Sequence, residues 1–212
     1  MPQTDSHPGR RNTVALIMLA GILTVAGCAD TDSDHVTTAP MPAVPLIPSG
    51  LSWRTWQGID LPVAAQGPRL VDGALATDFD HTPVGAALAA IHATVRMSVA
   101  PDGQWASVGQ RMLAPGPGRD RWATARAQIS ITSPAGPDTV PTILGYVVAT
   151  YSDTEARVDT YSTYPDHSIT RNTATVIWAT DGWRLLLPES VAESPVTAAD
   201  SAPAAMIALK RS

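Results

Sequence analysis

The sequence has little cysteine, little phenylalanine and little charge of either sign. It contains one cysteine and one phenylalanine among 212 residues, and only 16% of its residues are charged. A single cysteine cannot form a disulfide within the chain, so a folded domain must depend on its apolar core. Hydrophobic residues make up 44% of the chain, which is enough for one domain with tails.

Basic residues are also scarce, which argues against a nucleic-acid-binding protein. The chain has 14 Lys and Arg against 19 Asp and Glu, and no stretch of it forms a basic stripe. A net negative charge repels a phosphate backbone. We therefore predict that this chain binds no nucleic acid.

The sequence lacks the common catalytic and metal-binding motifs. It has no Gly-x-Ser-x-Gly, no glycine-rich phosphate loop and no Cys/His spacing typical of a metal site. We interpret Gly116-Pro117-Gly118 as a linker only. We predict no cofactor and no metal, and we favour a binding protein while leaving an enzyme open.

The N-terminus has the pattern of an export signal. Arg10 and Arg11 precede residues 14–27, which are apolar and uncharged. This run is shorter than the roughly 20 residues that a membrane-spanning helix needs. We therefore predict a signal peptide over residues 1–27. The paired arginines leave both general secretory and twin-arginine export open.

The end of this signal resembles a bacterial lipobox, Val25-Ala26-Gly27-Cys28. The resemblance implies cleavage between Gly27 and Cys28 and lipidation of Cys28 with a diacylglyceryl group and palmitate-type acyl chains. Lipid on that cysteine would hold the protein on the extracytoplasmic face of the cell membrane. The alternative is a plain signal peptide that ends beside an incidental cysteine.

The mature chain divides into a tether, a domain and a tail. Residues 28–50 carry prolines at positions 40, 42, 45 and 48, so we predict a flexible, extended spacer that does not fold. We predict one domain over residues 51–188. Residues 189–212 are rich in Ala, Ser and Pro, and we predict a flexible tail.

The domain sequence changes from helical to strand patterns along its length. Thr82 and Pro83 suit the start of a helix over 82–99, and shorter helices are predicted over 102–112 and 119–131. Asp181-Gly182 predicts a hairpin within a series of strands at 143–151, 156–161, 169–180 and 183–187. Helices followed by a meander indicate an α+β fold, with the helices packed on a three- to four-stranded antiparallel sheet.

Three segments resemble an uncharacterised actinobacterial exported domain: Gly67-Pro68, residues 79–90 and Asp181-Gly182-Trp183. The resemblance covers about residues 53–188. It implies an exported or membrane-anchored protein encoded near conjugative or mobile elements. The order of helices and strands also resembles the NTF2-like (cystatin-like) cone, a fold found both in scaffold domains of conjugative systems and in small enzymes.

Four residues are candidates for a pocket: His81, His92, Asp159 and Tyr161. His81 ends the cluster 78–81, which could contribute metal ligands but which we interpret as the segment leading into a helix. His92 lies beside the apolar stripe of the helix and could face a cavity under the sheet. Asp159 and Tyr161 share one face of a strand and could supply acid–base chemistry.

These observations support three hypotheses. The leading one is a surface-tethered lipoprotein interaction module with a protein partner, acting as an accessory of a membrane export or conjugation assembly. The alternative is a small-molecule-binding or cone-type enzyme domain with a pocket between helix 82–99 and the sheet. The third is a purely structural envelope lipoprotein with neither partner nor pocket.

Overall fold

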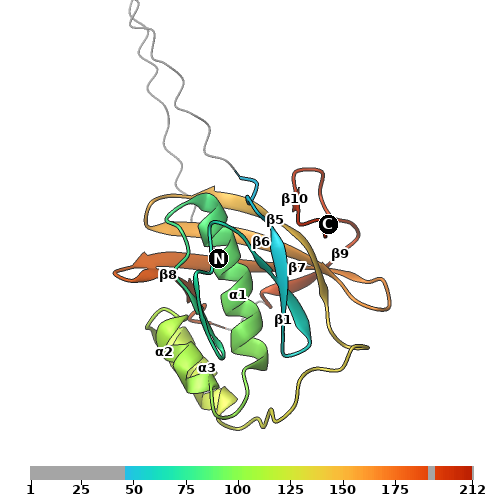
Figure 1. Ribbon diagram of the computed structural model, residues 1–212. Helices are drawn as coiled ribbons and strands as arrows, with labels where there is room; N and C mark the ends of the chain where they lie inside the picture. The colour runs from blue at the N-terminus through green and yellow to red at the C-terminus, as the bar shows by residue number, and fades with distance from the viewer. Residues whose placement is uncertain (1–45, 191–193, 212) are drawn as a thin grey trace, which may run out of the picture. The chain divides into compact units, whose positions relative to one another are not determined.

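The computed structural model describes residues 46–190 and 194–211 (Figure 1). The predicted signal peptide, the predicted lipid site at Cys28 and nearly all of the predicted tether lie outside these residues. Within the described ranges, no helix is both long enough and apolar enough to cross a membrane.

The centre of the fold is a six-stranded antiparallel sheet in the order β10-β5-β6-β7-β8, with β9 also paired to β7. Four of its strands form the predicted meander: β5 (Thr142–Tyr151), β6 (Glu155–Thr163), β7 (Ile169–Ala179) and β8 (Gly182–Leu186). The prediction of helices with an antiparallel meander is confirmed. The sheet has six strands rather than three or four, because the C-terminal segment adds two.

The C-terminal segment, predicted to be flexible, contributes strands β9 (Val196–Ala199) and β10 (Ile207–Ala208). These strands pair with β7 and β5, whose backbone groups are otherwise free at those positions. Leu209 is 4% exposed and fixes the end of the segment in the core. Composition alone did not indicate this pairing, since it depends on backbone partners far along the chain.

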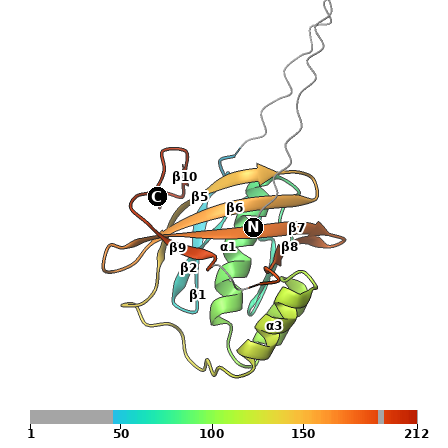
Figure 2. The ribbon, with the colours of Figure 1, turned by 180° about the vertical axis from the view of Figure 1, so that it is seen from behind.

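Helix α1 (Pro83–Val99) crosses one face of the sheet, and the opposite face carries none of the described helices (Figures 1 and 2). The Oγ1 of Thr82 accepts a hydrogen bond of 3.1 Å from the Gly85 amide, and Pro83 opens the first turn. The predicted helix is confirmed at both ends. Its first eleven residues are all buried, because β-structure surrounds them on several sides.

Two hairpins precede α1, in a part of the domain for which we predicted no helix or strand. The first joins β1 (Ser52–Trp56) to β2 (Ile59–Val63), and the second joins β3 (Leu70–Asp72) to β4 (Leu75–Thr77). The turn of the first hairpin is Gln57-Gly58, with φ angles of 51° and 82°. Two positive φ angles are typical of the type I′ turn. Gly58 adopts such an angle easily, but glutamine is not a residue that usually indicates this turn in a sequence.

The polypeptide before β1 is fixed to the domain by side-chain contacts. The hydroxyl of Tyr146 on β5 donates a hydrogen bond of 2.5 Å to the Leu46 carbonyl. The side-chain amide of Gln66 donates to the Ser49 hydroxyl, and its oxygen accepts from the Ser49 amide. The described end of the predicted tether is therefore attached to β5 and to the loop between β2 and β3.

Helices α2 (Trp105–Arg111) and α3 (Pro117–Arg126) are shorter than the predicted 102–112 and 119–131. Helix α3 begins two residues before the predicted start, so Pro117 and Gly118 are helical and are not merely a linker. Proline suits this position because it needs no hydrogen-bond donor there. Gly118 is needed because a Cβ atom would lie 2.3 Å from the Leu187 carbonyl oxygen.

Candidate functional site

His92 on α1 is part of the packed core and does not line a cavity. It is 1% exposed, and its Nδ1 accepts a hydrogen bond of 3.4 Å from Nε of Arg96. The other ring nitrogen must then carry the proton and donate to the Pro62 carbonyl at 2.8 Å. Burial, with a smaller contribution from the positive charge of Arg96, lowers the pKa of His92 to about 3.

The depressed pKa of His92 predicts an acid-sensitive fold. Above pH 6.5 neither the folded nor the unfolded state protonates this residue, so it adds no pH dependence. Below pH 6.5 His92 becomes protonated in the unfolded state, whereas in the folded state it stays neutral down to about pH 3. As the pH falls from 6.5 to about 3, this one residue should lower the free energy of unfolding by about 1.4 kcal/mol per pH unit.

Urea unfolding at pH 7, 6 and 5 tests this expectation by comparing the chain with its His92→Gln variant. The variant should be less stable at pH 7 but should lose less stability between pH 6 and pH 5. His167→Gln is the matched control, because His167 lies exposed in the turn between β6 and β7. Equal pH slopes for the chain and for His92→Gln would contradict the assignment of a neutral, buried His92.

Asp159 and Tyr161 on β6 lie on the other side of the sheet from His92. The alternating residues Ala156, Val158 and Thr160 are buried, so Asp159 and Tyr161 face away from α1. Asp159 is half-buried and accepts a hydrogen bond of 2.6 Å from the Thr173 hydroxyl. Tyr161 is only 7% exposed. The sheet therefore separates these two residues from the helix.

His81 belongs to a cluster of aromatic rings at one end of the meander. Its ring stacks on Trp178 with centroids 3.8 Å apart and meets Trp183 edge-on at 5.4 Å. Its Nε2 forms a hydrogen bond with the Asp153 carbonyl. These contacts attach the segment before α1 to the β5–β6 turn and to the β7–β8 hairpin. The four predicted pocket residues therefore occupy three separate places.

The segment 78–81 has a structural role in positioning α1. The Asp80 carbonyl accepts hydrogen bonds of 2.9 Å from Trp183 Nε1 and from the Thr82 amide. The Asp80 carboxylate forms an ion pair of 2.6 Å with Arg69. Among the residues that the structure describes, no three His, Cys, Asp or Glu side chains are grouped as metal ligands.

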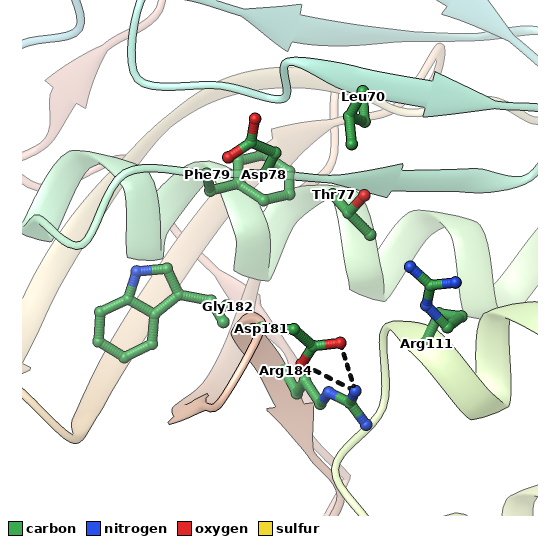
Figure 3. A pocket seen from close by; sticks show the side chains of 9 residues that line it. Leu70, Thr77, Asp78, Phe79, Arg111, Asp181, Gly182 and Arg184 are labelled. Carbon is green, nitrogen blue, oxygen red and sulfur yellow. Dashed lines mark hydrogen bonds and ion pairs between the residues drawn. The ribbon is translucent and has the colours of Figure 1, made fainter.

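A cavity of about 270 Å³ lies beside this aromatic cluster (Figure 3). It is formed by the β3–β4 hairpin and the residues after it, by the end of α2, and by the start of β8. Its lining residues are Leu70, Thr77, Asp78, Phe79, Arg111, Asp181, Gly182, Trp183 and Arg184. We call it the β3–β8 cavity. Asp78 has a φ of 63°, an uncommon backbone conformation for a residue other than glycine.

Most charges around the β3–β8 cavity are paired with one another. Arg184 donates to both carboxylate oxygens of Asp181 at 2.9 Å. These hydrogen bonds hold the pKa of Asp181 below its usual range, and the nearby charge of Arg111 lowers it further. Asp78 lies 3.8 Å from the guanidinium of Arg69. Arg111 has no hydrogen-bond or ion-pair partner within residues 46–190 and 194–211.

A second hollow, the α3 groove, is larger, with a volume of about 1210 Å³, and more open. It lies along α3, between Met97 of α1 and the residues that follow β8, and Trp122 and Ile129 contribute apolar surface to it. Ile129 is 56% exposed. Neither hollow lies in the predicted position between α1 and the sheet, where the side chains are closely packed.

The comparisons with known proteins identify a family. Residues 24–204 match the family described as Domain of unknown function (DUF8175). The chain belongs to this family. No match was found among curated proteins or among solved structures. The resemblance to an uncharacterised domain is therefore confirmed. The matched region includes Cys28, the three described helices and every described strand except β10.

Sequence reasoning missed Arg111 and the Asp181–Arg184 pair. The spacing of Asp181 and Arg184, three residues apart across a hairpin turn, was the available signal for their ion pair. Arg111 had no signal, because it approaches the cavity only through the packing of α2 against the rest of the domain. Figure 3 shows its guanidinium directed toward Thr77, which lies at the end of β4.

Proposed function

We propose that the protein is a lipid-anchored interaction module on the extracytoplasmic face of the cell membrane. The lipobox-like Val25-Ala26-Gly27-Cys28 and the proline-rich residues that follow support the anchor and the spacer. The family match begins at residue 24, so this segment belongs to the region the family shares. The folded residues after the spacer would then be held near the membrane, where a membrane protein is the most accessible partner.

The β3 strand carries the interaction part of this proposal. Leu70 and Val71 on β3 are 63% and 43% exposed, and Leu70 lines the cavity that the unpaired Arg111 also lines. Exposed apolar side chains next to an unpaired cation are suited to a partner segment with apolar and acidic side chains. We propose that this partner is an extracytoplasmic segment of a membrane export or conjugation assembly, the kind of system that the exported-domain resemblance implies.

The packing under α1 favours surface recognition over an enclosed pocket. Leu88 and Ile91 on α1 are at most 1% exposed, and Val158 and Val176 on the sheet are fully buried. A helix across a curved antiparallel sheet is also the arrangement of the NTF2-like cone, and we keep that relationship as a proposal. Fold likeness of this kind does not assign an activity.

Replacing Cys28 tests the anchor directly. Cys28→Ser in the full-length chain should abolish labelling by an alkyne analogue of palmitate and should move the protein out of the membrane fraction, because serine cannot accept the thioether-linked lipid. Ser33→Ala is the control, since it alters a nearby hydroxyl and keeps the cysteine. Membrane association and labelling that persist in Cys28→Ser would refute the lipid anchor.

In-cell crosslinking followed by affinity recovery and mass spectrometry tests the partner. Membrane proteins of an export or conjugation assembly should be enriched with the full-length chain and lost with Cys28→Ser and with Leu70→Asp. Ile129→Asp is the matched control, because Ile129 is similarly exposed but lies in the α3 groove. The absence of any enriched partner would overturn the proposal and favour a structural envelope lipoprotein.

A further inference from the structure

We infer that the β3–β8 cavity binds a carboxylate group attached to a short apolar body. This inference rests on the proposed function, because it names the chemistry by which the surface beside β3 would recognise a ligand. It is carried by two unpaired donors, the Arg111 guanidinium and the Thr77 hydroxyl, which line the same cavity. Neither donor has a partner among the described side chains.

The charge pairing around the cavity leaves one cation available. Asp181 is already held by two hydrogen bonds from Arg184, and Arg184 also donates to the Gln110 carbonyl. Asp78 lies near Arg69, and in Figure 3 its carboxylate points away from Arg111. Among the described residues that line the cavity, Arg111 is therefore the one charged group without a hydrogen-bond or ion-pair partner, since Asp181, whose charge it attracts, is already bound by Arg184. An anion that enters the cavity would complete the pairing.

The planar guanidinium of Arg111 favours a carboxylate ligand. Guanidinium groups bind carboxylates with two parallel hydrogen bonds, and a neighbouring hydroxyl can donate a third. Thr77 lines the same cavity, and rotation about its Cα–Cβ bond would direct its hydroxyl to a carboxylate bound at Arg111. Arg111 is exposed, so a ligand can reach its guanidinium from solvent.

The other walls of the cavity select an apolar body for the ligand. Phe79 and Trp183 are 5% and 6% exposed and present ring surface, and Leu70 borders the opening. A volume of about 270 Å³ is below the usual range for drug-sized ligands. It suits an aromatic or branched aliphatic acid, supplied either as a free small molecule or as the C-terminal carboxylate of a peptide. Inorganic phosphate and sulfate lack the apolar part.

The test is a titration of the full-length protein, purified in detergent, with benzoate and with 4-methylvalerate. The indole N–H of Trp183 is the reporter, because Trp183 lines the cavity and its NMR signal is identified by its loss in Trp183→Phe. Both acids should shift this signal in a saturable manner, while benzamide, which lacks the charge, should bind at least about tenfold more weakly. A peptide with a C-terminal Phe carboxylate, compared with its amide, distinguishes the two sources of the ligand.

Arg111→Gln should weaken the binding of both acids by about tenfold or more, and Thr77→Val should weaken it less. Arg157→Gln is the matched control, because Arg157 is also exposed and also lacks a described partner, but it lies on β6 away from the cavity. Equal binding of benzoate and benzamide, or unchanged binding in Arg111→Gln, would overturn the inference. So would no shift of the Trp183 signal with any of these probes.

The outcomes for the cavity and for the proposed function are separable. If the unmodified chain binds neither acid but still carries lipid and a crosslinked partner, only the carboxylate site is refuted. Acid binding that persists in a chain without lipid or partner would refute only the interaction module.

Discussion

Gly85→Ala is expected to lower the free energy of unfolding by about 3 kcal/mol or more, although alanine normally stabilises a helix relative to glycine. A Cβ atom at position 85 would lie 2.0 Å from the Asp80 carbonyl oxygen and 2.8 Å from its carbon. That carbonyl also accepts hydrogen bonds from Trp183 and from Thr82. The backbone must therefore move, and the movement breaks the contacts that position α1.

Chemical denaturation of the full chain measures this effect, with Gly103→Ala as the control. A Cβ atom added at Gly103 would meet no heavy atom within 4 Å, and Gly103 has no positive φ, so its replacement should change stability by at most about 0.5 kcal/mol. For a domain of this size the melting temperature of Gly85→Ala should fall by roughly 10 °C. A Gly85→Ala chain as stable as the parent would show that Asp80 can move away from α1 without cost.

Arg96→Ala is expected to destabilise the fold by about 3 kcal/mol, because it removes a buried cation that joins two hairpins to α1. Arg96 is 2% exposed and donates a hydrogen bond of 3.0 Å to the Gly73 carbonyl in the β3–β4 hairpin. Its guanidinium lies over the Trp56 ring of β1, 4.7 Å from the centroid. Burial lowers its pKa to about 10, so the side chain stays charged at neutral pH.

The location of the damage distinguishes this role from a general loss of packing. Hydrogen exchange should accelerate in the β1–β2 and β3–β4 hairpins of Arg96→Ala before it accelerates in the large sheet. Arg96→Met should recover about half of the lost stability, because it refills the volume but leaves the Gly73 carbonyl and His92 Nδ1 without a donor. Arg54→Ala, at an exposed position on β1, should have little effect. Uniform acceleration across all strands would argue against a local link.

The parts of the fold that sequence predicted are those with strong local signals. Helix α1 has a capping threonine, a proline at its first position and apolar residues at helical spacing. The four strands of the meander are long, rich in β-branched residues and separated by short turns. In both cases the signals come from residues that are close together in the chain. The hairpin before β8 was predicted with its turn one residue late, since Gly182 is already paired.

The parts that sequence missed depend on contacts between distant segments. Strands β9 and β10 are short, and only the free edges of β7 and β5 make them strands. On α1 the apolar Val95 is only partly buried, whereas its charged neighbour Arg96 is 2% exposed. Hairpins on both sides of α1 enclose positions that a helix packed on a single sheet would leave in solvent. The unpaired Arg111 was missed for the same reason.

The attachment of residues 46–50 determines how the domain responds to tension. A pull on the chain that precedes Leu46 acts first on the hydrogen bond from Tyr146 and then on the bonds between Ser49 and Gln66. Beyond them the load reaches β1, which is paired only with β2 among the described strands and is not part of the six-stranded sheet. Mechanical work on the N-terminal side would therefore act first on the β1–β2 hairpin, and through its Pro62 carbonyl and Trp56 ring it would reach His92 and Arg96 on α1.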